Sequence, residues 1–225
     1  MHIETSTPIC SVALSERGNL VALKELPGNA NQASMLAILI KEAMISSKLE
    51  FNALDGIVLS AGPGSYTGLR IGAATAKGLC YALSKPLITI DSLQSLAIGM
   101  QQKHEYKASV YCPTIDARRN EIYYALFDER AVTLFPSANK ILDETFLTDQ
   151  PKGRTLLIGG SGAQKCFQVL PHRNNLEFDF TTVASAKWMI TPATDKLVAK
   201  EFADFRTFEP NYIKPAFITA KRKIF

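Results

Sequence analysis

The sequence has few of the residues that build metal centres and disulfide frameworks. Its 225 residues include three histidines, one tryptophan and four cysteines, which are Cys10, Cys80, Cys112 and Cys166. The cysteines lie far apart in mainly apolar segments, without a Cys-x-x-Cys pair or a histidine at ligand spacing. These absences argue against a zinc site or a disulfide framework, and we expect reduced, mostly buried thiols.

Long hydrophobic runs and a secretory signal are also missing. No apolar run approaches the roughly 18 residues that a membrane-spanning helix needs. The opening residues, Met1-His2-Ile3-Glu4, lack the basic start and apolar stretch of a signal peptide. We therefore expect a cytoplasmic protein.

The composition is that of a folded protein. Hydrophobic residues make up 47% of the chain and charged residues 20%, and a chain of this length can bury about 70–75% of its unfolded surface. The formal net charge is +4, part of it near the C-terminus at Lys214, Lys221, Arg222 and Lys223. This cluster predicts either a solvated tail or a contact with nucleic acid.

Hydrophobic periodicity predicts an α/β fold for the first half of the chain. Three strands are expected first, at residues 3–6, 10–14 and 20–26. The following helix, 32–48, has too many apolar positions for one stripe, so we expect it to be covered on more than one side. A central strand at 56–59, a glycine loop with a helix to about residue 82, and a strand at 87–90 complete this half.

The second half repeats the same order of elements after a polar stretch, 101–105, that we interpret as a linker. The expected strands are 110–115, 121–127, 132–135 and 155–158, and the expected helices are 163–169 and 182–200. The repetition predicts two similar α/β lobes, residues 1–103 and 104–225.

The glycine segment, 62–72 (GPGSYTGLRIG), joins a strand to a helix, a place that suits an anion. It lacks the Lys-Ser or Lys-Thr pair of a phosphate loop and the spacing of a dinucleotide fingerprint. Candidate anion or nucleotide contacts are Thr5, Ser6, Gly64 and Ser65. Ser65 is more simply explained as a helix cap than as a nucleophile.

Small residues recur at every fourth position of this segment and its helix, at Gly64, Gly68, Gly72, Ala76 and Cys80. They form a strip that another backbone can approach closely, and such packing would offset the roughly 1 kcal/mol that each helical glycine costs. The spacing leaves two partners open: another part of this chain, such as the 32–48 helix, or a second subunit.

Several motifs closely resemble the TsaB (YeaZ) family, and the resemblance spans nearly the whole chain. The motifs are residues 3–7 (IETST) with 10–14 (CSVAL), 62–72 with 76–79 (AKGL), Asp116-Ala117-Arg118 with Glu121-Ile122-Tyr123, 160–163 (GSGA) and 210–214 (PNYIK). Three positions depart from the family pattern: Glu4 replaces an aspartate, Asn31 a histidine and Ala37 a proline.

The resemblance implies two actin-like or sugar-kinase-like lobes and a role in making threonylcarbamoyladenosine on tRNA. It implies a non-catalytic subunit that pairs with the catalytic subunit TsaD, is joined by the ATPase TsaE, and meets tRNA through the complex. A homodimer is expected without the partner, and ATP or ADP is expected at most in the assembled complex. The implied interface lies on the first helix and the helix after the glycine block: Met35, Leu36, Leu39, Gly64, Gly68, Arg70, Gly72 and Ala76.

Two enzymatic alternatives remain: a stand-alone ATPase or phosphotransferase, and a protease acting on TsaD through Ser65. Glu4 is not followed by the glycine that would let a backbone approach phosphates. His2, His104 and His172 are too far apart to form a two-histidine metal site on one helix. The charged cluster of Asp116, Arg118 and Glu121 is either a surface ion pair or a second contact surface.

Overall fold

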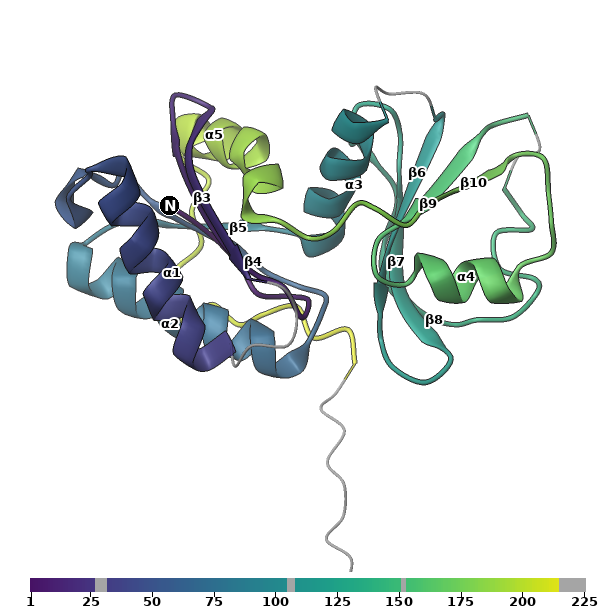
Figure 1. Ribbon diagram of the computed structural model, residues 1–225, viewed down its shortest axis with the longest axis horizontal. Helices are drawn as coiled ribbons and strands as arrows, with labels where there is room; N and C mark the ends of the chain where they lie inside the picture. Colours follow the sequence, from purple (N-terminus) through teal and green to yellow (C-terminus); the bar gives the residue numbers. More distant parts are fainter. Residues whose placement is uncertain (27–31, 105–107, 151–152, 215–225) are drawn as a thin grey trace, which may run out of the picture.

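The computed structural model describes residues 1–26, 32–104, 108–150 and 153–214, which form two α/β lobes (Figure 1). Each lobe contains a five-stranded sheet, and the sheets have the same topology: β3-β2-β1-β4-β5 and β8-β7-β6-β9-β10. In each, the first three strands are antiparallel neighbours and the last two add in parallel. The predicted two-lobe, actin-like fold is therefore confirmed.

The strands of the first sheet are β1 (His2–Glu4), β2 (Cys10–Glu16), β3 (Asn19–Leu26), β4 (Ile57–Ser60) and β5 (Leu87–Ile90). Those of the second are β6 (Val110–Asp116), β7 (Glu121–Phe127), β8 (Thr133–Ile141), β9 (Leu156–Gly159) and β10 (Leu176–Asp179). Side chains alternate between the two faces of each sheet, so each lobe has two separate apolar layers to cover.

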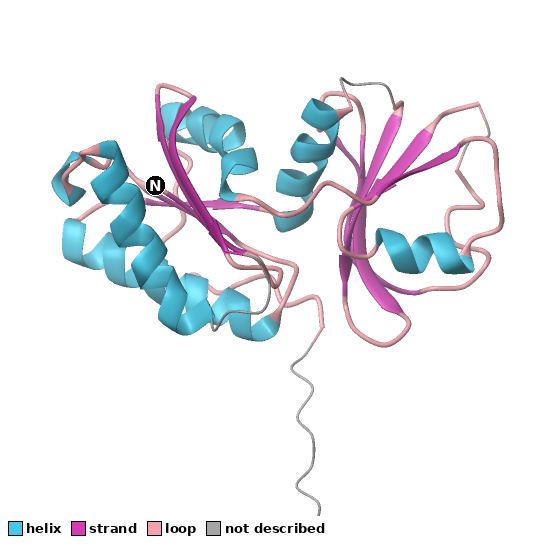
Figure 2. Cartoon of the chain, in the orientation of Figure 1, coloured by secondary structure: helices cyan, strands magenta, loops and turns pink. Residues whose placement is uncertain are grey.

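Helices cover both faces of both sheets (Figure 2). In the first lobe, α1 (Gln32–Ser47) and α2 (Tyr66–Leu83) lie on one face, and η2 (Ala186–Met189) with α5 (Ile190–Ala199) on the other. In the second lobe, α3 (Ser92–Lys103) and α4 (Ala163–Val169) lie on opposite faces. A short 3-10 turn, η1 (Phe51–Ala53), follows α1.

One α-helix and one β-strand were not predicted, α3 and β10, nor was the short 3-10 turn η1. Asp91 caps α3 by accepting hydrogen bonds from the N–H groups of Leu93 (2.8 Å) and Gln94 (3.1 Å), a start signal that was readable from the sequence. The linker interpretation of 101–105 is wrong for its first part, because Gln101 is buried in α3 and donates to the Asp128 carbonyl at 2.8 Å. Residue 105 lies outside the described residues.

The C-terminal segment, assigned from the sequence to the second lobe, returns to the first. Ala186, Met189 and Ala193 pack against Val58 and Ile88 on the sheet face that the first 103 residues leave uncovered. The helix expected at 182–200 accordingly starts later, as η2 followed by α5. The chain then continues along the first lobe, where Ala203 pairs with Leu87.

The four cysteines are buried and free, as expected. None of the helices in the described ranges is long and apolar enough to span a membrane.

Candidate functional site

The glycine strip packs inside the chain. A Cβ at Gly64 would overlap Ser6, and a Cβ at Gly68 or Gly72 would overlap Thr5. The Thr5 hydroxyl donates to the Gly68 carbonyl at 2.8 Å. The close neighbours of the glycines are therefore the end of β1 and the residues after it, with Gln32 at the start of α1 also close to Gly68, so the strip packs within this chain.

The predicted interface residues divide into two groups by burial. Five are buried within the first lobe: Leu36, Leu39, Gly68, Gly72 and Ala76. Arg70 is exposed, and Met35 and Gly64 are partly exposed. The buried five face the sheet because they occupy the inward stripes of α1 and α2, so a partner would meet the opposite stripes of these helices.

The outward stripes of α1 and α2 carry apolar side chains. Ile45 on α1 is 65% exposed and Tyr81 on α2 is 79% exposed. Ile38 is also exposed, and nothing lies within 4 Å of a Cβ placed on Gly78. The predicted coverage of the first helix on more than one side is therefore incomplete in the single chain.

Two of the positions that depart from the family pattern belong to this region. Asn31 lies outside the described residues, and Ala37 is exposed on α1.

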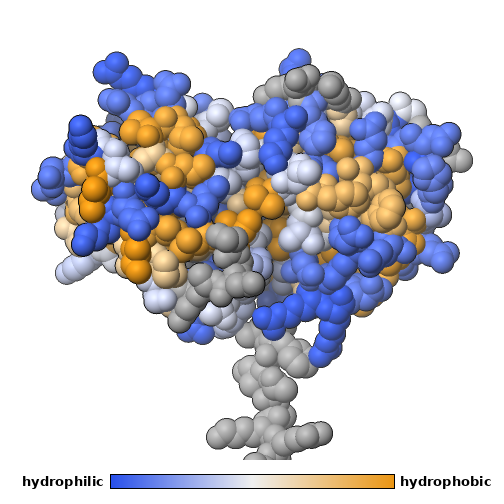
Figure 3. Space-filling model, viewed as in Figure 1, coloured by the Kyte–Doolittle hydropathy of each residue, from blue (hydrophilic) through white to orange (hydrophobic). Residues whose placement is uncertain are grey.

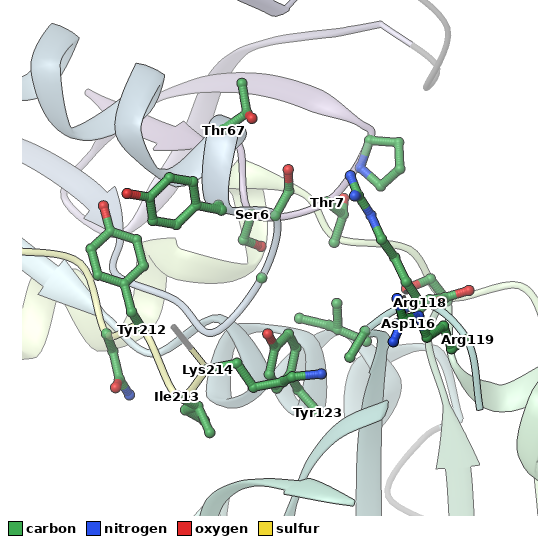
Figure 4. Close-up of a pocket in the computed structure, with 18 of the residues that line it drawn as sticks. Ser6, Thr7, Thr67, Asp116, Arg118, Arg119, Tyr123, Tyr212, Ile213 and Lys214 are labelled. Carbon is green, nitrogen blue, oxygen red and sulfur yellow. Dashed lines mark hydrogen bonds between the residues drawn. The ribbon is translucent and has the colours of Figure 1, made fainter. Parts of the chain in front are cut away.

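A cleft of about 870 Å³ separates the two lobes (Figure 4). It is lined by residues 6–8 and 64–67 of the first lobe, by residues 115–119, Tyr123, Ser161 and Lys165 of the second, and by residues 211–214. The motifs at 62–72, 116–123, 160–163 and 210–214, which are far apart in the sequence, thus contribute to one place. Spacing alone did not indicate this convergence.

The predicted anion contacts reach the cleft only in part. Ser65 lines it as the N-cap of α2, where its hydroxyl accepts from the Gly68 N–H at 3.3 Å. Gly64 and Ser6 also line it, but Ser6 is fully buried. Thr5 does not, because its side chain faces α2.

Two lysines in the cleft are paired with carboxylates. The Lys165 ammonium lies 2.6 Å from Asp116, and the Lys214 ammonium lies 2.5 Å from Glu121. Hydrogen bonds from Lys214 and Asn139 lower the pKa of Glu121. The ion-pair interpretation of the charged cluster therefore holds for Asp116 and Glu121, with partners that the sequence did not identify.

The C-terminal segment crosses the cleft as a strap, which we define as residues 211–214. The Asn211 N–H donates to the Ala61 carbonyl in the first lobe at 2.7 Å. The Tyr212 ring lies 5.0 Å from that of Tyr66 at the start of α2. Because Lys214 reaches Glu121 in the second lobe, it belongs to the strap rather than to a basic tail. Lys221, Arg222 and Lys223 lie outside the described residues.

Glu4 lies beneath the cleft and does not line it. It is fully buried, and its carboxylate accepts from the Ser6 N–H at 2.6 Å. Burial raises the pKa of this carboxyl. Within the described part of the chain, no three His, Cys, Asp or Glu side chains gather in a group that could hold a metal ion.

The three histidines have separate surroundings. The His2 ring is 2.7 Å from the Ser15 hydroxyl, the His104 ring is 3.1 Å from the Asp179 carboxylate, and His172 is exposed. None of them lines the cleft beside Ser65. Ser65 is therefore held as a helix cap without an adjacent histidine base.

Comparison with known proteins identifies similar sequences. A family model described as "TsaD: tRNA N6-adenosine threonylcarbamoyltransferase" matches residues 27–188. The "tRNA threonylcarbamoyladenosine biosynthesis protein TsaB" of Haemophilus influenzae is 37% identical over 125 residues, 56% of this chain and 52% of that protein. The match thus spans about half the length of that relative. The Bacillus subtilis protein of the same name is 27% identical over 230 residues, 98% of this chain and 96% of that protein.

A solved structure has the same fold. The structure titled "YeaZ from Pseudomonas aeruginosa" superposes with a TM-score of 0.77 at 22% identity, over 93% of this chain and 97% of that one.

Proposed function

Since the chain belongs to the TsaB (YeaZ) family, we propose that it is a non-catalytic subunit for threonylcarbamoyladenosine biosynthesis on tRNA. In this proposal it binds and supports a catalytic subunit of the TsaD type, with the ATPase TsaE as a further component. The tRNA meets the assembled complex.

The observation that carries the proposal is the exposed apolar side of α1 and α2. Ile38, Ile45 and Tyr81 are large apolar or aromatic residues on outward stripes of two adjacent helices. Large apolar side chains exposed on neighbouring elements of a folded protein are common at sites that another protein covers. Aromatic residues such as Tyr81 frequently dominate the binding energy of such sites.

The surroundings of Glu4 and Ser65 support a non-catalytic role. The Glu4 carboxyl is buried beneath the cleft with a raised pKa, so it is poorly placed to hold a metal or a phosphate. Ser65 caps α2 and has no histidine base beside it. We therefore expect the pure chain to show neither transferase activity nor adenine-nucleotide turnover.

The experiment is co-elution with the TsaD protein of the same organism after co-expression. Ile45→Glu and Tyr81→Ala are each expected to weaken co-elution at least about tenfold, because each removes an exposed anchor from the proposed interface. Val198→Glu is the matched control. Val198 is 80% exposed on α5, on the opposite face of the first sheet, and its change should leave co-elution intact.

Normal co-elution of both folded variants would contradict the proposed face, and absence of co-elution with the unchanged chain would contradict the proposed role. The same face is expected to pair two copies when TsaD is absent. Ile45→Glu should therefore shift the free protein towards the monomer in sedimentation velocity.

A further inference from the structure

Three phenylalanine rings form an exposed cluster at the outer edge of the second sheet. Phe167 lies on α4, Phe178 on β10 and Phe180 directly after β10, with ring centroids 5.3, 5.7 and 6.0 Å apart. Phe167 is 56% and Phe180 51% exposed. Figure 3 shows apolar side chains gathered over α4 and β10. None of the three rings lines the cleft, and the cluster lies on the other lobe from the outward stripes of α1 and α2.

The turn that displays Phe180 is rigidly held. The buried Asp179 carboxylate accepts from the N–H groups of Thr181 (2.8 Å) and Thr182 (3.0 Å). Burial opposes ionisation of Asp179, but the hydrogen bonds from Thr182 and Thr181 outweigh it and lower the pKa to about 2. Lys103 also donates to the Thr181 carbonyl at 2.8 Å. Because the turn is already ordered, binding of a ligand to Phe180 would cost little additional conformational entropy.

Lysine ammonium groups lie at both ends of the 181–183 segment. Lys103 contacts Thr181 at one end. At the other, the Trp188 indole donates to the Val183 carbonyl at 3.1 Å, and the Lys187 ammonium is 4.3 Å from the centre of the Trp188 ring. The segment that directly follows the cluster is thus flanked by a cation at each end.

Basic side chains outnumber acidic ones in the stretch of chain that carries the cluster. Between residues 153 and 188 the basic side chains are Arg154, Lys165, Arg173 and Lys187, and the acidic ones are Glu177 and Asp179. Asp179 is buried. Glu177 is adjacent to Phe178 on β10, so its side chain points to the opposite face of the sheet. The partner that fits this surface is anionic and has flat apolar groups.

We propose that the phenylalanine cluster and its flanking lysines form a contact surface for RNA, on which unpaired bases stack. Aromatic rings stack bases of any sequence, and lysines neutralise the adjacent phosphates. The proposal rests on the function proposed above, which supplies an RNA substrate, but it concerns the lobe opposite the TsaD-binding face.

The test measures binding of a fluorescein-labelled, 12-nucleotide single-stranded RNA by anisotropy, with a duplex of the same length for comparison. Phe167→Leu and Phe180→Leu keep an apolar side chain but remove the ring face. Each should weaken single-strand binding about fivefold or more, as expected for the loss of one stacked base. Phe202→Leu changes an exposed phenylalanine beyond α5 and should have no effect.

Two further measurements support the test. Trp188 is the only tryptophan in the sequence, so its fluorescence should change when RNA binds beside Val183. Lys103→Gln with Lys187→Gln should weaken binding and flatten its dependence on salt, because fewer phosphates are neutralised. These two lysine changes also test the surface if a leucine variant fails to fold in thermal unfolding.

The proposal is overturned if the unchanged chain binds no single-stranded RNA, if it binds the duplex equally well, or if the cluster variants bind like Phe202→Leu. Weakened co-elution of Phe180→Leu with TsaD, at unchanged RNA affinity, would make the cluster a protein interface and would also overturn it. The co-elution of the unchanged chain tests the proposed function separately. That function survives if RNA binding fails while co-elution persists.

Discussion

Single side chains decide the chemistry beneath the cleft. Glu4 stands where the family resemblance leads us to expect an aspartate, and it is fully buried, with its carboxylate bonded to the Ser6 N–H. Because water cannot solvate this carboxyl, its pKa is raised in the folded protein. The unfolded state then releases the proton at lower pH than the folded state, so Glu4 costs stability as the pH rises above its ordinary pKa of 4.5.

Glu4→Gln should therefore be more stable than the unchanged chain at pH 7–8, with a difference that shrinks towards pH 4.5. The measurement is urea unfolding across this pH range. Glu50→Gln, at an exposed position, is the control. A constant difference between Glu4→Gln and the unchanged chain at all pH values would contradict ionisation as the cause.

At the scale of elements, α2 combines two kinds of glycine. Gly68 faces the Thr5 backbone so closely that no Cβ fits, whereas Gly78 faces open space on the same helix. Both positions lack the helix-stabilising effect of alanine, which is worth about 1 kcal/mol. The packing of Gly68 against the end of β1 offsets this loss, but Gly78 has no such contact within the described residues.

Gly68→Ala and Gly78→Ala should therefore have opposite effects on the free energy of unfolding. Gly68→Ala is expected to lower it by about 1–3 kcal/mol through overpacking. Gly78→Ala should raise it by about 0.5–1 kcal/mol. Denaturant unfolding measures both. Equal effects would mean that the strip does not pack against β1.

At the scale of the whole molecule, the strap joins the lobes. Asn211 and Tyr212 contact the first lobe, and Lys214 pairs with Glu121 in the second. The pairing lowers the pKa of Glu121, so its contribution to stability is present above pH 4.5 and is lost as the pH falls through the lowered value.

A double-mutant cycle with Lys214→Met and Glu121→Gln should therefore show favourable coupling at pH 7 and low salt. The coupling should decline as the pH is lowered below 4.5 and when salt is added. The pair Lys140 and Asp143, within the second lobe, is the control for local ion pairing. No coupling at pH 7 would show that Lys214 does not hold the lobes together.

Local chemistry was largely readable from the sequence. The alternation of Cys10 to Leu14, the cap at Ser65 and the four-residue spacing of the glycines each depend on a few neighbouring residues, and the structure contains the corresponding strand, cap and close-packed helix. The repeated order of strands and helices also predicted two similar lobes. The short strand β10 was missed because four residues hold little periodic signal.

Only the tertiary structure decided which surfaces face each other. The spacing of Gly64, Gly68 and Gly72 required a close neighbour but could not identify it as Thr5 and Ser6, because that contact joins residues about 60 positions apart. The same holds for Lys214 with Glu121. The sequence by itself thus determined that the glycine helix packs closely and that the chain forms two lobes. The long-range folding of the chain decided that this packing is internal, and that the outward stripes of α1 and α2 stay exposed.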